Sequence, residues 1–416
     1  MRLLAATVTV LAALASPAVA GADVITSWNR TFVDALEATH TPPPAAHRSA
    51  AIVACSVFDA VNGVARQFTA VHVEPAAPHG TSRAAAAVAA AHESLVALFP
   101  SQQAMLDARY AASLEGLGSS AAVERGLLWG AQVADEILAW RATDGFSAVL
   151  PAYVPSTLPG RWQPTPPAFG PPLFRQFAQM TPFALASAAQ FTLPGPPPLR
   201  SARYAHDFNE VEALGRVDSS VRTATETETA KFWQLDTPAG MWDRVADDLA
   251  EQNPSSLVRE ARALALTNIS LADATIAVWN AKNAFDSWRP VTAIERADQD
   301  GNAETSPDPS WLPLLATPPF QEYPSAHSGI SASAASQLAY VYGAHATFTV
   351  SSNGLPGVTR SFSGFSAALS QVADARIFAG FHFRFSCDDA LVLGNEIARY
   401  IRSTQLLRIA RQDGST

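Results

Sequence analysis

The sequence contains very few cysteines and lysines. Cys55 and Cys387 are the only two cysteines in 416 residues. A disulfide framework and a thiolate metal site are therefore excluded, and the two cysteines can pair at most once. Lys231 and Lys282 are the only lysines, and the other basic residues are all arginines. A position that keeps lysine in such a chain is a candidate functional site, because an ammonium and a guanidinium group are not interchangeable.

Basic charge and long apolar runs are also scarce. The 28 basic residues are outnumbered by 37 acidic residues, so we expect no nucleic-acid partner. An apolar run from Leu3 to Ala15 precedes a small-x-small triplet at residues 18–20. The run is shorter than the ~20 residues of a membrane span. This pattern predicts a signal peptide over residues 1–20, no membrane span, and a secreted or periplasmic protein.

Helical patterns dominate what is present. Alanine- and leucine-rich segments carry apolar residues three and four positions apart, whereas strict alternation is scarce. We therefore predict an all-α protein, with serine N-caps at Ser101 and at Ser119 or Ser120. The expected helices lie near residues 44–66, 81–98, 101–116, 119–142, 201–215, 222–235, 255–288, 328–343, 361–375 and 388–410.

A proline-rich segment interrupts these helices. Residues 151–200 contain 13 of the 30 prolines, a density at which no helix persists. The same segment is rich in aromatic residues, which argues against a flexible linker. We predict an ordered strap over 151–200. It would separate an N-terminal helical bundle at 21–150 from a C-terminal helical domain at 201–416 that carries the active site.

The first of three short clusters contains the second lysine. Trp279, Lys282, Asp286 and Arg289 precede Pro290. At ~100° per residue, Lys282 and Arg289 come within ~20° of each other around a helix. We predict that they share one helix face as half of an anion site, and that Pro290 ends the helix. The alternative is a solvated face with an ion pair between Lys282 and Asp286.

The second cluster precedes a helix of small residues. It contains a hydroxyl at Ser325, backbone N–H groups and the imidazole of His327. Such a turn at a helix N-terminus suits an oxyanion, because unpaired amides and the helix dipole both favour negative charge there. The alternative is an ordinary serine cap with an unrelated histidine.

The third cluster holds an arginine and a histidine six positions apart. On a straight helix Arg376 and His382 would lie ~120° apart, so they converge only if the helix bends or ends between them. Gly380 is the expected position of that break. The alternative is an apolar helix end with a buried histidine.

Together, the three clusters resemble a known signature. Lys-x6-Arg-Pro, Pro-Ser-small-His and Arg-x5-His occur in this order after residue 270. They are similar to the motifs of vanadium-dependent haloperoxidases and type 2 phosphatidic acid phosphatases. Residues 42–62 and 162–167 resemble the secreted, chloroperoxidase-like bacterial branch. The resemblance implies a pair of four-helix bundles.

The resemblance also implies roles for individual residues. His382 would occupy the apical position, bonded to vanadium in a peroxidase or attacking phosphorus in a phosphatase, and His327 would act as acid and base. Lys282 would also polarise bound peroxide. An aromatic rim would be formed by Trp279 and Phe320. The equatorial oxygens of vanadate or phosphate would be bound by Lys282, Arg289, Arg376, the Ser325 hydroxyl and the Ala326 amide.

Two positions depart from the family pattern. Ala326 stands where glycine is usual, and its amide can donate provided that the backbone does not need a positive φ. Ser386 stands where the family has an aspartate four residues after the apical histidine. Asp388 or Asp389 could replace that carboxylate, although Ser386 with Asp389 also fits a capping box for the last helix. If the missing carboxylate limits the enzyme, Ser386→Asp should raise activity.

The anion-binding residues do not distinguish two activities. We favour a vanadate-dependent haloperoxidase acting on hydrogen peroxide and a halide, because the aromatic rim would restrict water. The alternative is a soluble acid phosphatase without a cofactor, which would act on a phosphate ester through a phosphohistidine. A second alternative is a non-catalytic secreted helical protein with a vestigial site. Retention of Lys282 argues against it.

Overall fold

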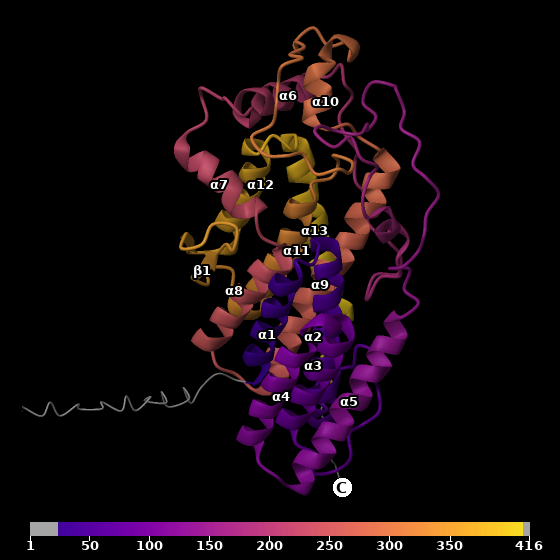
Figure 1. Ribbon diagram of the computed structural model, residues 1–416, viewed down its shortest axis with the longest axis vertical. Coiled ribbons are helices and arrows are strands. Elements are labelled where there is room, and N and C mark those ends of the chain that lie inside the picture. Colours follow the sequence, from indigo (N-terminus) through magenta and orange to yellow (C-terminus); the bar gives the residue numbers. More distant parts are fainter. Residues whose placement is uncertain (1–23, 411–416) are drawn as a thin grey trace, which may run out of the picture.

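A computed structural model describes residues 24–410, so the predicted signal peptide lies outside the described residues. This part of the chain is mostly helical, which confirms the all-α prediction (Figure 1). The α-helices are α1 (Val24–Thr39), α2 (Pro43–Ala65), α3 (Arg83–Leu98), α4 (Gln103–Leu117), α5 (Ala121–Arg141), α6 (Ala202–Gly215), α7 (Ala224–Gln234), α8 (Pro238–Gln252), α9 (Leu257–Phe285), α10 (Pro290–Glu295), α11 (Ala326–Tyr342), α12 (Phe365–Phe378) and α13 (Arg384–Thr404). Short 3-10 helices lie at η1 (Pro100–Gln102), η2 (Arg175–Gln179) and η3 (Ala297–Gln299).

Helices α1 to α5 lie together in the lower part of Figure 1. Small residues allow α3 and α5 to approach closely, since a Cβ added at Gly130 would lie only 2.2 Å from the Ala86 carbonyl oxygen. The 29-residue helix α9 packs against α2 on one side and α11 on another, so it joins the two halves of the molecule.

The C-terminal half is built around α11 and α13. These helices also meet through small residues, because a Cβ added at Gly394 would lie 2.1 Å from the Gly329 carbonyl oxygen. At the start of α11, the Ser325 N–H donates to the Ser386 carbonyl at 3.2 Å. The second and third sequence clusters are therefore held side by side by backbone contacts.

Some elements were not predicted from the sequence. Helices α1, α8 and α10 were missed, as was an antiparallel hairpin of β1 (Phe348–Ser351) and β2 (Thr359–Phe362), in which Phe348 pairs with Phe362. Helix α8 is amphipathic but rich in acidic residues, so it lacks the alanine and leucine richness of the others. Ser120 caps α5 as expected, whereas the predicted cap at Ser101 is wrong because that residue lies inside η1.

The proline-rich segment lies against α9. The Asp273 carboxylate accepts hydrogen bonds from three successive backbone N–H groups at residues 183–185, at 2.6, 2.8 and 2.9 Å. Near the other end of the helix, the Trp162 N–H donates to the Asp286 carbonyl at 2.8 Å. The side chains of Trp162 and Phe177 are buried. Contacts at the middle of α9 and just after its C-terminal end thus anchor this segment, the second of them close to Lys282.

Two helices, α2 and α9, are long and apolar enough to cross a membrane, but 83% and 94% of their most apolar windows are buried inside the protein. Their apolar faces are used in the core. The sulfur atoms are also mostly inside: Cys55 and Cys387 are buried and unbridged within the described chain. Met180 and Met241 are buried as well.

Candidate active site

Lys282 lies in the last turn of α9 with its side chain wholly buried. Its Nζ donates to the carbonyl oxygens of Gln321 and Glu322 at 2.7 and 2.9 Å. The helix ends three residues later, at Phe285, and the C-cap residue Asp286 adopts a left-handed conformation with φ of 50°. The Asp286 carboxylate accepts from the Tyr153 hydroxyl at 2.8 Å instead of pairing with Lys282.

The predicted shared face of Lys282 and Arg289 is wrong. Arg289 follows the break at Asp286 and is the N-cap of α10, in which Pro290 occupies the first turn. Proline suits that position because its missing N–H would be unpaired there in any case. Pro290 therefore starts a helix and does not end one. The two cations still converge, because the break turns the chain back toward the end of α9.

Arg289 joins the second cluster to the third. Its Nε donates to the Phe320 carbonyl at 2.7 Å, and its Nη1 donates to the Phe381 carbonyl at 2.9 Å. The same Nη1 lies 3.2 Å from Nε2 of His382. The guanidinium group is therefore fixed before any anion arrives.

The second cluster forms the N-terminus of α11. Ser325 is the N-cap residue, and its hydroxyl lies 3.0 Å from that of Ser328. Ala326 is the first helical residue, and its φ is not positive. Its substitution for glycine therefore leaves the amide able to donate. The His327 side chain is partly exposed, although its Nε2 is buried.

The third cluster breaks where the sequence predicted. Helix α12 ends at Phe378, Gly380 adopts φ of 79°, and the Phe381 N–H donates to the Arg376 carbonyl at 3.1 Å. This turn brings the buried side chains of Arg376 and His382 into one site. Arg376 also donates through Nη1 to the Gln234 side chain at 2.6 Å. Gln234 lines a cavity of about 410 Å³, so Arg376 lies just behind that cavity's wall.

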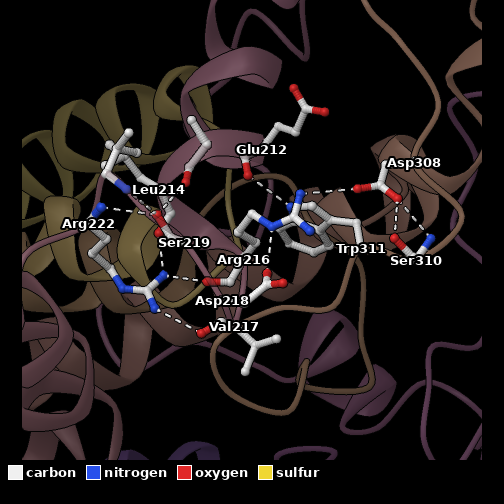
Figure 2. A network of polar contacts seen from close by, with 12 residues as sticks. Glu212, Leu214, Arg216, Val217, Asp218, Ser219, Arg222, Asp308, Ser310 and Trp311 are labelled. Carbon is white, nitrogen blue, oxygen red and sulfur yellow. Dashed lines mark hydrogen bonds and ion pairs between the residues drawn. The ribbon is translucent and has the colours of Figure 1, made fainter.

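A polar network fixes the C-terminal end of α6 and the loop that follows it (Figure 2). Arg222 donates to the carbonyl oxygens of Leu214 and Arg216 at 2.5 and 2.6 Å, and Arg216 forms an ion pair with Asp308 at 3.1 Å. The end of α6 and the loop that contains Pro313 pack directly on the Gly380 turn. A Cβ added at Gly380 would lie 2.6 Å from the Gly215 carbonyl oxygen and 2.8 Å from Cβ of Pro313.

A carboxylate that was not predicted from the sequence contacts His382. Glu322 is wholly buried, and its Oε1 lies 2.8 Å from Nδ1 of His382. The Phe383 N–H donates to the same oxygen at 3.2 Å. No local pattern marks a partner 60 residues away in the chain. The only available signal was an acidic residue directly before the Tyr-Pro-Ser turn.

The proposed substitutes for the family aspartate are wrong. Ser386 does not open a capping box, because α13 begins two residues earlier, at Arg384, with Phe383 as its N-cap. Asp389 accepts from the Tyr323 hydroxyl at 2.7 Å, and Asp388 is exposed. The Ser386 hydroxyl lies 3.5 Å from Nδ1 of His382, farther than the Glu322 carboxylate.

The electrostatics of the site favour a bound anion. Burial and the neighbouring arginines lower the pKa of Lys282 well below its ordinary value. Burial lowers the pKa of Arg289 to about 9 and that of Arg376 to about 10. Burial also raises the pKa of Glu322 to about 7, against the opposing effect of Lys282 and Arg289. Buried positive charge therefore exceeds buried negative charge, and an anion would offset it.

Both histidines are held neutral by the same environment. Burial, followed by the positive charge of the neighbouring cations, lowers the pKa of His382 and of His327 well below the ordinary value. His47, on α2, is near enough to contribute to the effect on His327. At neutral pH each imidazole therefore keeps one nitrogen lone pair.

Buried polar atoms without partners show what the site fits. Within the described chain, Arg289 Nη2, Arg376 Nε and His327 Nε2 are buried and have no hydrogen-bond partner. Buried donors without partners are costly, so an acceptor in their midst would be strongly favoured. Residues 24–410 contain no group of three or more His, Cys, Asp or Glu side chains placed to hold a metal ion. This set of donors suits an oxyanion. We call the set the cradle; it consists of Lys282, Arg289, Arg376, Ser325 and the Ala326 amide.

The two predicted rim residues have different positions. The Phe320 ring lies 5.3 Å from Lys282 Nζ and 4.9 Å from the Arg289 guanidinium carbon, so it forms a wall of the cradle. Trp279 is only 3% exposed and packs behind Phe320, with ring centroids 5.3 Å apart. Its other ring neighbours, Phe174 and Phe177, belong to the proline-rich segment.

Comparison with known proteins places these residues in a wider context. Residues 262–408 match the family model of the VCPO second helical-bundle domain. The vanadium chloroperoxidase of Curvularia inaequalis is 28% identical over 267 residues, which cover 52% of this chain. The match spans 43% of that protein, less than half of its length.

Two solved structures share the fold. A bacterial vanadium-dependent iodoperoxidase superposes with a TM-score of 0.82 at 25% identity, covering 96% of this chain and 100% of the other. A holo-type bacterial vanadium-dependent chloroperoxidase superposes with a TM-score of 0.68 at 16% identity, covering 94% of each chain. The predicted type of helical bundle is thereby confirmed.

Proposed function

Because the chain is a relative of the vanadium haloperoxidases in both sequence and fold, we propose that it binds vanadate in the cradle and oxidises a halide with hydrogen peroxide to hypohalous acid. The observation that carries this proposal is the convergence of three buried cations beside a neutral His382, where Arg289 and Arg376 each keep a donor atom without a partner. When bound, vanadate supplies a Lewis-acidic centre that activates hydrogen peroxide for oxygen transfer to the halide.

The cradle residues bind and neutralise the anion. Lys282, Arg289 and Arg376 supply fixed positive charge in a site from which water is largely excluded, where charge stabilisation is strongest. The Ser325 hydroxyl and the Ala326 amide donate from the N-terminus of α11, where the helix dipole also favours an anion. These groups are largely preorganised, because backbone carbonyl oxygens already fix Lys282 and Arg289.

His382 would hold the vanadium atom through Nε2. An arginine N–H can only donate, so the contact from Arg289 Nη1 identifies Nε2 as the acceptor and as the atom with the lone pair. Nδ1 then carries the proton and donates a hydrogen bond to Glu322 Oε1. The imidazole is therefore neutral and presents its lone pair toward the cradle.

His327 would move protons at the opposite side of the site. Its Nε2 is buried and has no partner within residues 24–410, and its lowered pKa leaves it neutral and able to accept a proton. Phe320 covers one wall of the cradle and limits water there. Restricting water would favour transfer of oxygen to the halide over competing hydrolysis.

The test is halogenation of a phenol dye by the purified protein with hydrogen peroxide and iodide, bromide or chloride. It is run before and after incubation with orthovanadate, beside hydrolysis of p-nitrophenyl phosphate. We expect vanadate-dependent halogenation with at least one halide. Phosphate release that vanadate inhibits, without halogenation, would instead identify phosphohistidine chemistry. Inactivity in both assays would contradict an enzymatic role.

Variants of the two histidines separate binding from chemistry. His382→Ala should abolish vanadate retention and turnover, because it removes the vanadium ligand. His327→Ala should keep anion binding and lose most activity, because it removes only the proton-transfer group. Vanadate retention is measured by equilibrium dialysis with elemental analysis. Normal peroxidase activity in His382→Ala would overturn the assignment.

We further propose that the protein is exported and acts on small molecules, without a nucleic-acid partner or a membrane span. Export rests on the sequence pattern of residues 1–20, and a mature N-terminus at Gly21, found by N-terminal sequencing, would support it. The absence of a span is supported by the burial of the apolar faces of α2 and α9 in the core. An uncleaved N-terminus would contradict export, and recovery of the protein only with membranes would contradict the absence of a span.

A further inference from the structure

We propose that Glu322 is the positioning residue of the apical histidine, in place of the aspartate that the family resemblance would lead one to expect at Ser386. The carboxylate thus comes from the turn before α11 rather than from the first turn of α13. This inference rests on the proposed function for the role of His382. The contact between Glu322 and His382 is present in the protein without vanadate.

The hydrogen bonds around His382 leave one arrangement of its protons. Arg289 Nη1 donates to Nε2, so Nδ1 must be the protonated nitrogen, and Glu322 Oε1 is the acceptor 2.8 Å from it. A carboxylate that accepts from the far nitrogen of a ligating imidazole fixes the tautomer and makes the ligating nitrogen more basic. Glu322 is placed to do both.

Glu322 is itself held in position on three sides. Its N–H donates to the Ser287 carbonyl at 3.0 Å, its carbonyl accepts from Lys282 Nζ at 2.9 Å, and its Oε1 accepts from the Phe383 N–H at 3.2 Å. The same residue therefore binds a cradle cation through its backbone and the apical histidine through its side chain. A shift of either group would be transmitted to the other.

Ser386 is a poor candidate for this role. Its hydroxyl lies 3.5 Å from Nδ1, at the limit of a hydrogen bond, and a hydroxyl can turn to donate as readily as to accept. Its position nevertheless shows that a longer side chain at 386 could reach Nδ1. An aspartate there should therefore take over from Glu322 when Glu322 is shortened.

The experiment compares the wild-type protein with Glu322→Ala, Glu322→Gln, Ser386→Asp and the double variant Glu322→Ala/Ser386→Asp. Long-range 1H–15N correlation spectra of the vanadate-free protein report the His382 tautomer, with His382→Gln used to assign the signal. Equilibrium dialysis with orthovanadate reports affinity. Asp388→Asn is the matched control, because it removes an exposed carboxylate near His382 in sequence.

The proposal predicts a specific pattern. Glu322→Ala should lose the uniform Nδ1–H tautomer and weaken vanadate binding by about 10- to 100-fold. The double variant should recover the tautomer and most of the affinity. Ser386→Asp alone should bring no gain, because His382 already has a carboxylate and a second buried acid beside it is unfavourable. Asp388→Asn should match the wild type in both measurements.

Two outcomes would overturn the proposal. One is an unchanged tautomer and an affinity within twofold of wild type in both Glu322 variants. The other is loss of affinity without a tautomer change and without recovery in the double variant, which would show a merely structural role. The tautomer signal needs neither vanadate nor turnover. A wild-type protein that shows the Nδ1–H tautomer but binds no vanadate would therefore contradict the proposed function and not this contact.

Discussion

The Lys282 ammonium group occupies a site shaped for a small cation. It is wholly buried, and two adjacent carbonyl oxygens receive its protons at 2.7 and 2.9 Å. A third proton remains for an anion in the cradle. A guanidinium group is planar and larger, so it would not fit between Phe320 and these carbonyl groups without displacing them.

We therefore expect Lys282→Arg to be harmful although it conserves charge. Overpacking should lower the free energy of unfolding by about 1–3 kcal/mol and weaken binding of orthovanadate. Urea unfolding and equilibrium dialysis measure the two effects. The other lysine provides the control: Lys231→Arg on α7, outside the cradle, should change neither quantity. Wild-type affinity in Lys282→Arg would show that the compact ammonium group is not required.

At the residue scale, the cradle could be predicted because its members belong to short motifs with fixed spacing. Glu322 could not be predicted in the same way. Its contact with His382 depends on how α11 and α13 pack. In the chain, 59 other residues separate Glu322 from His382. The carboxylates closest to Ser386 in sequence do not contact His382. Asp388 is exposed, and Asp389 accepts a hydrogen bond from Tyr323.

The elements around the site depend on one tight turn. Gly380 lies two residues after the end of α12 and has φ of 79°, a left-handed conformation that L side chains adopt only with strain. Gly215, at the end of α6, and the loop that contains Pro313 pack against it. Arg216 and Arg222 fix these two segments (Figure 2). The turn thus sets the separation of Arg376 and His382.

Gly380→Ala should damage both stability and anion binding. The left-handed backbone and the close approach of Gly215 and Pro313 together should cost about 3 kcal/mol of unfolding free energy. Gly357→Ala is the control, because Gly357 has φ of 84° but open space around its Cα, and it should cost about 1 kcal/mol. Equal losses of stability, with unchanged vanadate affinity, would show that the packing on Gly380 is unimportant.

At the element scale, helices with regular apolar spacing were predictable, and so was the break at Gly380, where glycine marks the change. The break between α9 and α10 was not. It occurs at Asp286, a non-glycine residue held left-handed while Tyr153 and Gln321 bind its carboxylate from other segments. A tertiary contact therefore decides where that helix ends, and the local sequence through Pro290 reads as one continuous helix.

The whole molecule should be sensitive to acid. His47 is 1% exposed, and burial lowers its pKa from about 6.5 to about 3. Between these two values the unfolded chain takes up a proton that the folded chain does not, so stability is present above pH 6.5 and is lost as pH falls toward 3. The lowered pKa values of His327 and His382 act in the same direction.

This dependence can be measured by urea unfolding at pH 7 and pH 5. His47→Gln should reduce the loss of stability between these values by about 2 kcal/mol, since one group contributes about 1.4 kcal/mol per pH unit. His79→Gln, which changes an exposed histidine, should leave the loss as it is in the wild type. An unaltered pH dependence in His47→Gln would show that the acid sensitivity arises elsewhere.

The burial of sulfur has a consequence for an enzyme that releases hypohalous acid. Thiols and thioethers are among the groups that strong oxidants attack first, and accessibility decides which are damaged. Here both cysteines and two of the three methionines in the described chain are buried, and the Lys282 amine is as well. The proposed enzyme would thus expose few side chains that its own product could oxidise. The scarcity of cysteine and lysine would slow its inactivation during turnover.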